Sequence, residues 1–164
     1  MAALDLVPDL GLTRLLYSIE DDMALITEAV TAQLKEEFAK LKDPVRLVVF
    51  SQALADPDSE QVKRLVEEIA AVDSRITAES YNFVLDKEKV EALRIQRIPV
   101  IAVMGAEKDY GIRMYGLPSG YEFGCLVDAI LDVSSGDSGL GEETRKALAE
   151  IARPVHLQVF STPT

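Results

Sequence analysis

The feature that most constrains the fold is an internal repeat with an offset of 110 positions. Residues 43–51 read Asp-Pro-Val-Arg-Leu-Val-Val-Phe-Ser, and residues 153–161 read Arg-Pro-Val-His-Leu-Gln-Val-Phe-Ser, with six of nine positions identical. The offset continues upstream, where Phe-Ala-Lys-Leu at 38–41 faces Leu-Ala-Glu-Ile at 148–151. In both copies a helical pattern ends at a proline and an apolar strand follows. Helix-Pro-strand is a common pattern, so chance is the alternative, but the match spans both elements without a gap.

A period of 110 residues has the size of a small domain and exceeds that of a solenoid repeat. The sequence therefore predicts one complete unit over residues 22–133, preceded by an N-terminal extension over residues 1–21. Residues 134–141 are rich in Gly, Ser and Asp and are predicted to be a linker. Residues 142–164 are predicted to be the first helix and strand of a second unit that is truncated.

The pattern of apolar residues within the unit predicts the order βαβαββα. A strand-helix-strand start implies parallel strands with a right-handed crossover, and the strand-strand-helix end implies an antiparallel hairpin. We therefore expect an α/β fold, with a four-stranded mixed sheet flanked by helices on both faces. The expected elements are helix 22–42, strand 45–50, helix 59–72, strand 79–85, helix 87–93, strand 100–104, strand 109–115, helix 121–133, helix 142–152 and strand 155–160.

Composition excludes several classes of protein. The formal net charge of −11 argues against a nucleic-acid binder, which needs a concentrated basic face. No apolar run approaches the roughly 20 residues of a membrane-spanning helix, and the N-terminus carries acids where an export signal carries Lys or Arg. One Cys and one His exclude an internal disulfide and argue against a zinc site. We expect a cytoplasmic chain with protein partners, no metal and no cofactor.

Four stretches carry a resemblance to a known family. They are the strand Pro-Val-x-Leu-x-Val-Phe in both copies, Arg-Ile-Gln-Arg-Ile-Pro at 94–99, Tyr-Gly-Leu-Pro-Ser-Gly-Tyr-Glu-Phe at 115–123, and Val-Phe-Ser-Thr-Pro-Thr at 159–164. Over residues 22–164 the chain resembles the thioredoxin/glutaredoxin superfamily, and more closely the glutaredoxin-like protein disulfide oxidoreductases with two fused thioredoxin-like units. In architecture it also resembles the N-terminal domain of the alkyl hydroperoxide reductase flavoproteins. The resemblance implies a groove at Ile98 and Pro99, with a cis bond before Pro99.

The resemblance also implies a Cys-x-x-Cys motif after the first strand, and the sequence lacks it. In that motif a thiolate at a helix start has a lowered pKa, and a second thiol resolves the mixed disulfide. Here residues 51–59 contain no cysteine. Alignment on the following helix puts Asp56 and Ser59 in the two Cys positions, and a one-residue gap puts Ala55 and Asp58 there. The degenerate slot Asp56-Pro57-Asp58-Ser59 is either a plain helix cap with Pro in the first turn, or a vestigial site with a carboxylate replacing the thiolate.

Two further expectations concern single features. Cys125 lies in the middle of a predicted helix between core positions, so we expect it to be buried and structural. The strand at 155–160 is apolar, and if it were left unpaired it would be prone to associate with other chains. We expect it to add to an edge of its own sheet or to pair with another copy, in a homodimer through residues 142–164.

Two functional hypotheses follow. In the first, the chain is the redox-silent N-terminal unit of a glutaredoxin-like protein disulfide oxidoreductase in cell redox homeostasis. It docks substrates for a second unit, whose Cys-Pro-x-Cys motif the resemblance places directly after Thr164. In the second, the chain is a non-enzymatic interaction module with a thioredoxin fold. Under both hypotheses the 164-residue chain itself has no disulfide reductase activity.

Overall fold

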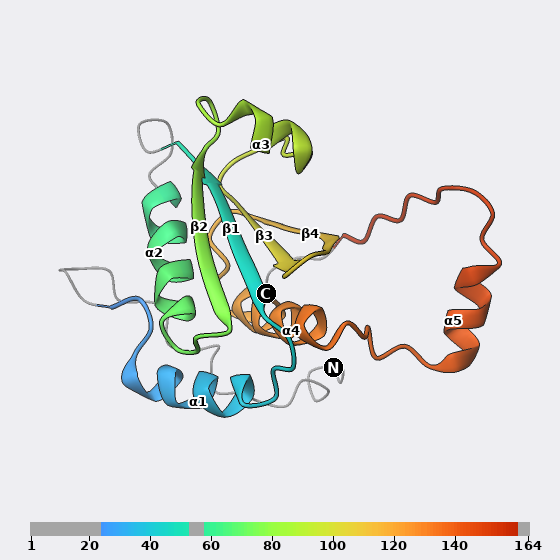
Figure 1. Ribbon diagram of the computed structural model, residues 1–164, viewed down its shortest axis with the longest axis horizontal. Helices are drawn as coiled ribbons and strands as arrows, with labels where there is room; N and C mark the ends of the chain where they lie inside the picture. Colours follow the sequence, from blue (N-terminus) through green and yellow to red (C-terminus); the bar gives the residue numbers. More distant parts are fainter. Residues whose placement is uncertain (1–23, 53–57, 161–164) are drawn as a thin grey trace.

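A computed structural model describes residues 24–52 and 58–160 of the chain (Figure 1). Its elements follow the predicted order βαβαββα, preceded by one helix and followed by another. They are α1 (Glu28–Phe38), β1 (Val45–Ser51), α2 (Asp58–Ala70), β2 (Ile76–Asn82), α3 (Lys87–Ala92), β3 (Val100–Gly105), β4 (Asp109–Tyr115), α4 (Tyr121–Ser135) and α5 (Glu142–Ala149). None of the helices in these two ranges is both long enough and apolar enough to cross a membrane.

The four strands form one mixed sheet in the order β2-β1-β3-β4. β1 runs parallel to β2 and antiparallel to β3, and β3 pairs antiparallel with β4. The predicted four-stranded mixed sheet is therefore confirmed. β1 and β3 are central strands, while β2 and β4 each have one described neighbour and form the two edges.

Each face of the sheet has its own apolar core. On β1, Leu47 and Val49 point to the larger core, which α1, α2 and α4 cover. Val48 and Phe50 point to the opposite face, where a smaller core packs against Val90 of α3 and the segment that follows it. Because both faces of β1 are covered, its apolar run is nearly continuous, as expected for a strand buried on both sides.

α1 is shorter than the predicted helix over residues 22–42. Thr27 caps its start, since the hydroxyl oxygen accepts a hydrogen bond from the Val30 N–H at 3.4 Å. At the other end, the Arg75 guanidinium donates hydrogen bonds to the carbonyls of Phe38 and Leu41, both at 2.7 Å. Arg75 thereby satisfies carbonyls that the helix end leaves without partners, and it ties α1 to the start of β2.

Asp73 holds Arg75 in place and makes stability depend on pH. Hydrogen bonds from the Arg75 side chain and backbone lower the pKa of Asp73 from 3.8 to about 2. Because the folded pKa lies below the unfolded one, the stabilisation is complete above about pH 4 and is lost as the pH falls toward 2. We expect Asp73→Asn to be less stable than wild type at pH 6 by under about 1 kcal/mol, since the pair is partly solvated. Chemical denaturation should show this gap closing at pH 2, and a gap of constant size would contradict the assignment.

The C-terminal end of α4 extends two residues into the segment predicted as a linker. Ser134 is buried, and its hydroxyl oxygen accepts hydrogen bonds from the Lys42 N–H at 2.9 Å and the Asp43 N–H at 3.0 Å. The same hydroxyl donates to the Asp43 carbonyl at 2.6 Å. Gly136 then ends the helix with a left-handed backbone, φ 65°. One serine thus joins the end of α4 to the connection between α1 and β1.

α5 stands apart from the sheet and its covering helices (Figure 1), although its Arg145 lines a cleft beside β4 and α4. α5 has no buried residue, and residues 150–160 after it are exposed and belong to no strand. The prediction that residues 155–160 add to an edge of their own sheet is therefore wrong for this structure, because β2 and β4 keep one neighbour each among the described residues.

Candidate functional site

The degenerate slot lies where β1 ends and α2 begins. α2 starts with Asp58, which is exposed in the first turn, where a carboxylate is favoured by the positive end of the helix dipole. The next residue, Ser59, is only 1% exposed. Its hydroxyl oxygen accepts a hydrogen bond from the Gln52 N–H at 3.5 Å, so Ser59 faces the end of β1. Asp56, Pro57 and Ala55 lie outside the described residues.

β3 brings Ile98 and Pro99 to the same end of the sheet as the slot. Val100 pairs with Phe50 on β1 and with Tyr115 on β4. Pro99 immediately precedes Val100, is buried, and its carbonyl accepts a hydrogen bond from the Gly116 N–H at 2.9 Å. The Ile98–Pro99 peptide bond is cis. The sheet therefore gathers Ser59, Ile98 and Pro99, which are far apart in sequence, at one end.

Exposed apolar side chains surround this end of the sheet. Val84 and Leu85 follow β2, whose Asn82 pairs with Ser51 at the end of β1. Tyr115 ends β4, and Tyr121 begins α4, whose far end packs near Gly105 at the opposite end of β3. We call this surface the rim; its residues are Ser51, Gln52, Asp58, Ser59, Val84, Leu85, Ile98, Pro99, Tyr115 and Tyr121.

The turn that carries Val84 and Leu85 is held by its own hydrogen bonds. The Asn82 side-chain oxygen accepts from the Val84 N–H at 2.9 Å and from the Leu85 N–H at 3.0 Å. The Asp86 carboxylate accepts from the Asn82 N–H at 2.6 Å. These bonds end β2 at Asn82, three residues before the predicted strand end, and fix an exposed apolar pair in place. Leu85 is 80% exposed, which is unusual for a leucine in an ordered turn.

Tyr115 is also held in position on the rim. The Arg97 guanidinium lies over its ring, 4.9 Å from the centroid, in a cation–π contact. Arg97 and Tyr115 are both exposed, so the pair presents an aromatic ring with a guanidinium stacked over it. The rim therefore offers apolar and aromatic contacts around a buried proline, which suits binding of a polypeptide.

The prediction that Cys125 is buried is wrong, because its side chain is exposed on α4. The buried residues of α4 are Phe123, Leu126, Val127, Ile130, Val133 and Ser134. A helix turns about 100° per residue, so position 125 falls on the opposite side from that stripe. The flanking apolar residues gave a misleading signal, and the helical spacing of the stripe would have placed Cys125 correctly.

None of the rim residues is a cysteine, and the helix alignment puts Ser59 in a predicted Cys position. The single cysteine of the chain, Cys125, is exposed on α4 one turn after Tyr121 and on the same side of the helix, so it lies next to the rim without a second thiol. Within the described ranges, no group of three or more His, Cys, Asp or Glu side chains could hold a metal ion. The rim is thus equipped for contact and lacks the paired thiols of a dithiol site. No signal in the sequence marks Val84 and Leu85 as rim residues, and the sequence favours the interpretation of Tyr115 and Tyr121 as aromatics at the edge of the core.

The known proteins to which this chain is similar are named as redox proteins. No family model matches the chain. Over 105 residues it is 34% identical to an "NADH dehydrogenase" of Ferdinandcohnia aciditolerans, a match that covers 64% of this chain and 18% of the relative. Over 137 residues it is 28% identical to the alkyl hydroperoxide reductase AhpF of Staphylococcus epidermidis, a match that covers 82% of this chain and 25% of the relative. The chain thus spans a quarter or less of these curated relatives.

Two solved structures share the fold. The NTD_N/C domain of the alkyl hydroperoxide reductase AhpF from Enterococcus faecalis matches with a TM-score of 0.67 and 30% identity, over 74% of this chain and 58% of that one. A protein disulfide oxidoreductase from Aeropyrum pernix matches with a TM-score of 0.68 and 26% identity, over 76% of this chain and 55% of that one. The sheet order, the covering helices and these neighbours together show that the chain is a thioredoxin-like protein, similar to the N-terminal domain of AhpF and to protein disulfide oxidoreductases.

Proposed function

We propose that the chain is a redox-silent thioredoxin-like unit that docks protein substrates for thiol–disulfide exchange carried out by a second unit. The observation that carries the proposal is a rim with exposed apolar contacts around Pro99 and no cysteine between positions 51 and 59. The redox activities named for the AhpF and disulfide oxidoreductase relatives support exchange as the process that the unit serves.

The slot cannot carry out thiol–disulfide exchange, because that reaction needs thiols. A thiolate must attack a disulfide sulfur, and a mixed disulfide must then be resolved by a second thiol. Neither Asp58 nor Ser59 can form a disulfide, and Ser59 is buried against the end of β1. Under either alignment, therefore, no residue in a predicted Cys position can attack the disulfide of a substrate.

The proposal of a second unit rests on the repeat. Every large apolar residue exposed between positions 140 and 160 has a counterpart 110 positions earlier that is buried in the described unit. The counterparts are at most 5% exposed, and the C-terminal residues are at least 41% exposed. The pairs are Val30 and Leu140, Phe38 and Leu148, Leu41 and Ile151, Val45 and Val155, Leu47 and Leu157, Val49 and Val159, and Phe50 and Phe160. We infer that residues 142–160 are built to enter a second thioredoxin-like core.

Docking on the rim is tested by nuclear magnetic resonance with an unfolded polypeptide as the probe. The ¹⁵N-labelled chain is titrated with carboxymethylated insulin B chain, which cannot exchange disulfides. We expect amide shifts at the rim, and we expect Leu85→Asp to weaken binding about tenfold, because it places a charge in the apolar contact. Leu140→Asp, at an exposed leucine outside the rim, is the matched control and should leave binding unchanged. Shifts confined to other surfaces, or equal affinity for both variants, would contradict the proposal.

The second candidate function is a non-enzymatic interaction module, which the absence of both cysteines also favours. The two candidates differ when a reduced thioredoxin with an active dithiol is supplied in solution. A docking unit for exchange should accelerate reduction of a substrate held on the rim, and Leu85→Asp should remove the acceleration. A module without a redox role should leave the rate unchanged or slow it by shielding the substrate.

A further inference from the structure

Residues 154–160, which we call the arm, belong to no helix or strand; in a strand, one of its sides would be apolar and the other would combine His156 and Gln158 with the exposed Phe160. Val155, Leu157 and Val159 alternate with His156 and Gln158, and all five are exposed. The repeat partner of the arm, β1, is apolar on both sides, and its buried Val48 corresponds to Gln158. A strand with one apolar side suits the edge of a sheet that has one covered face.

β4 is an edge strand of this sheet, and its more apolar face is the one that α4 covers. Among the described residues it pairs only with β3. Ile112 and Met114 pack against the core that α4 covers, whereas Arg113 and Tyr115 lie on the other face. The backbone of β4 on its outer side is therefore available for a further strand, and its apolar and polar sides alternate as those of the arm do.

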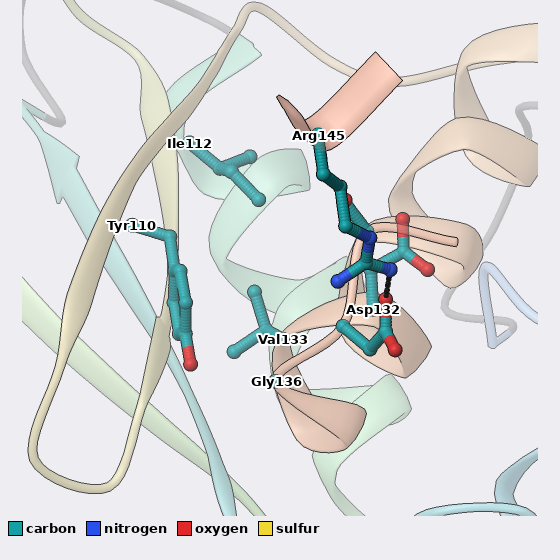
Figure 2. A pocket seen from close by; sticks show the side chains of 8 residues that line it. Tyr110, Ile112, Asp132, Val133, Gly136 and Arg145 are labelled. Carbon is teal, nitrogen blue, oxygen red and sulfur yellow. Dashed lines mark hydrogen bonds and ion pairs between the residues drawn. The ribbon is translucent and has the colours of Figure 1, made fainter. Parts of the chain in front are cut away.

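A cleft of about 350 Å³ runs beside β4 on the α4 side (Figure 2). One wall is apolar, formed by Tyr110 and Ile112 of β4 and by Val133 of α4. The other wall is polar; it contains Asp132 and the ion pair between Arg145 and Asp137. The hollow beside the opposite edge, β2, has only about 20 Å³ and is lined in part by Lys63 and Glu67. The β4 edge is thus the better place for apolar side chains.

We propose that the arm of one copy adds as a fifth strand to β4 of a second copy. Val155, Leu157 and Val159 then face the apolar wall of the cleft, and His156 and Gln158 lie on the side of Arg113 and Tyr115. A second copy is a suitable partner because it carries the same arm, whose Val155, Leu157 and Val159 match the apolar side of β4; the arm itself brings no acidic residue to the cleft beside Asp132 and Asp137. The inference does not rest on the proposed function: it gives the arm a different place from the second core proposed above, and the two placements exclude each other.

Sedimentation velocity of the 164-residue chain from 1 to 100 µM tests the association. We expect a concentration-dependent dimer. Leu157→Asp should weaken it at least tenfold, because the charge would enter the apolar wall. Gln158→Asp adds the same charge to the neighbouring position on the polar side and should weaken it much less. A monomer throughout the range, or equal effects of the two variants, would overturn the proposal.

Hydrogen exchange locates the contact without altering the core. In wild type, amides in 109–115 and in 154–160 should both become slower to exchange as concentration rises, and neither should do so in Leu157→Asp. Leu157 is 83% exposed, so this variant retains the fold of the unit. Protection of the arm alone would mean that arms pair with each other, and protection of residues 76–82 would place the arm on β2. Either result would overturn the assignment to β4.

Discussion

Replacing Leu47 by alanine is expected to lower the free energy of unfolding by about 2–5 kcal/mol. Leu47 lies in the centre of β1, is fully buried, and contacts the larger core beneath α1, α2 and α4. Its loss would leave a cavity between a central strand and three helices, where the surroundings can collapse only in part. Since small domains are stable by about 5–15 kcal/mol, this would be a large share of the total.

The repeat supplies a matched control for this variant. Leu157 is the counterpart of Leu47 at the offset of 110, and it is 83% exposed. Leu157→Ala should change the free energy of unfolding by no more than about 0.5 kcal/mol. Urea denaturation below 1 µM, where association is minimal, measures both variants. Similar losses for the two would show that the arm already belongs to a folded core.

Replacing Ser134 by alanine is expected to cost about 1–2 kcal/mol, although only one oxygen atom is removed. The variant leaves the amides of Lys42 and Asp43 without their acceptor and the carbonyl of Asp43 without its donor, at the buried Ser134 position. Lys42 and Asp43 are themselves exposed, so water can replace part of the lost bonding and the cost stays below that of fully buried groups. Ser135→Ala is the control, because its hydrogen bonds lie at the surface, and it should stay within about 0.5 kcal/mol. Equal thermal midpoints for the two variants would contradict this role of Ser134.

The core elements of the fold could be predicted because their pattern is set by burial. β1 and β3 are short, nearly uninterrupted apolar runs rich in Val, which is typical of a strand covered on both faces. α2 carries its apolar residues at helical spacing on one side. Each of these patterns lies within one element, so it can be recognised without knowledge of the rest of the molecule.

The features that were missed depend on partners distant in sequence. Ser134 is buried because the connection at residues 42 and 43 packs against it, and a Gly- and Ser-rich sequence after it favoured a linker. Arg75 bonds the carbonyls at the end of α1 from a position 34 residues or more away. The slot could be located from its place between β1 and α2, but the exposed apolar residues of the rim come together only when the sheet forms.

The central claim is that the unit keeps a thioredoxin-like slot without dithiol chemistry. Insulin reduction by dithiothreitol, followed by turbidity with the purified 164-residue chain, tests it most directly. We predict a rate equal to that without protein for wild type and for Cys125→Ser, and a faster rate when Asp56→Cys and Ser59→Cys are combined. A wild-type rate above the protein-free rate would contradict the claim that the unit is silent, and a double variant without any gain would contradict the alignment that puts Asp56 and Ser59 in the Cys positions.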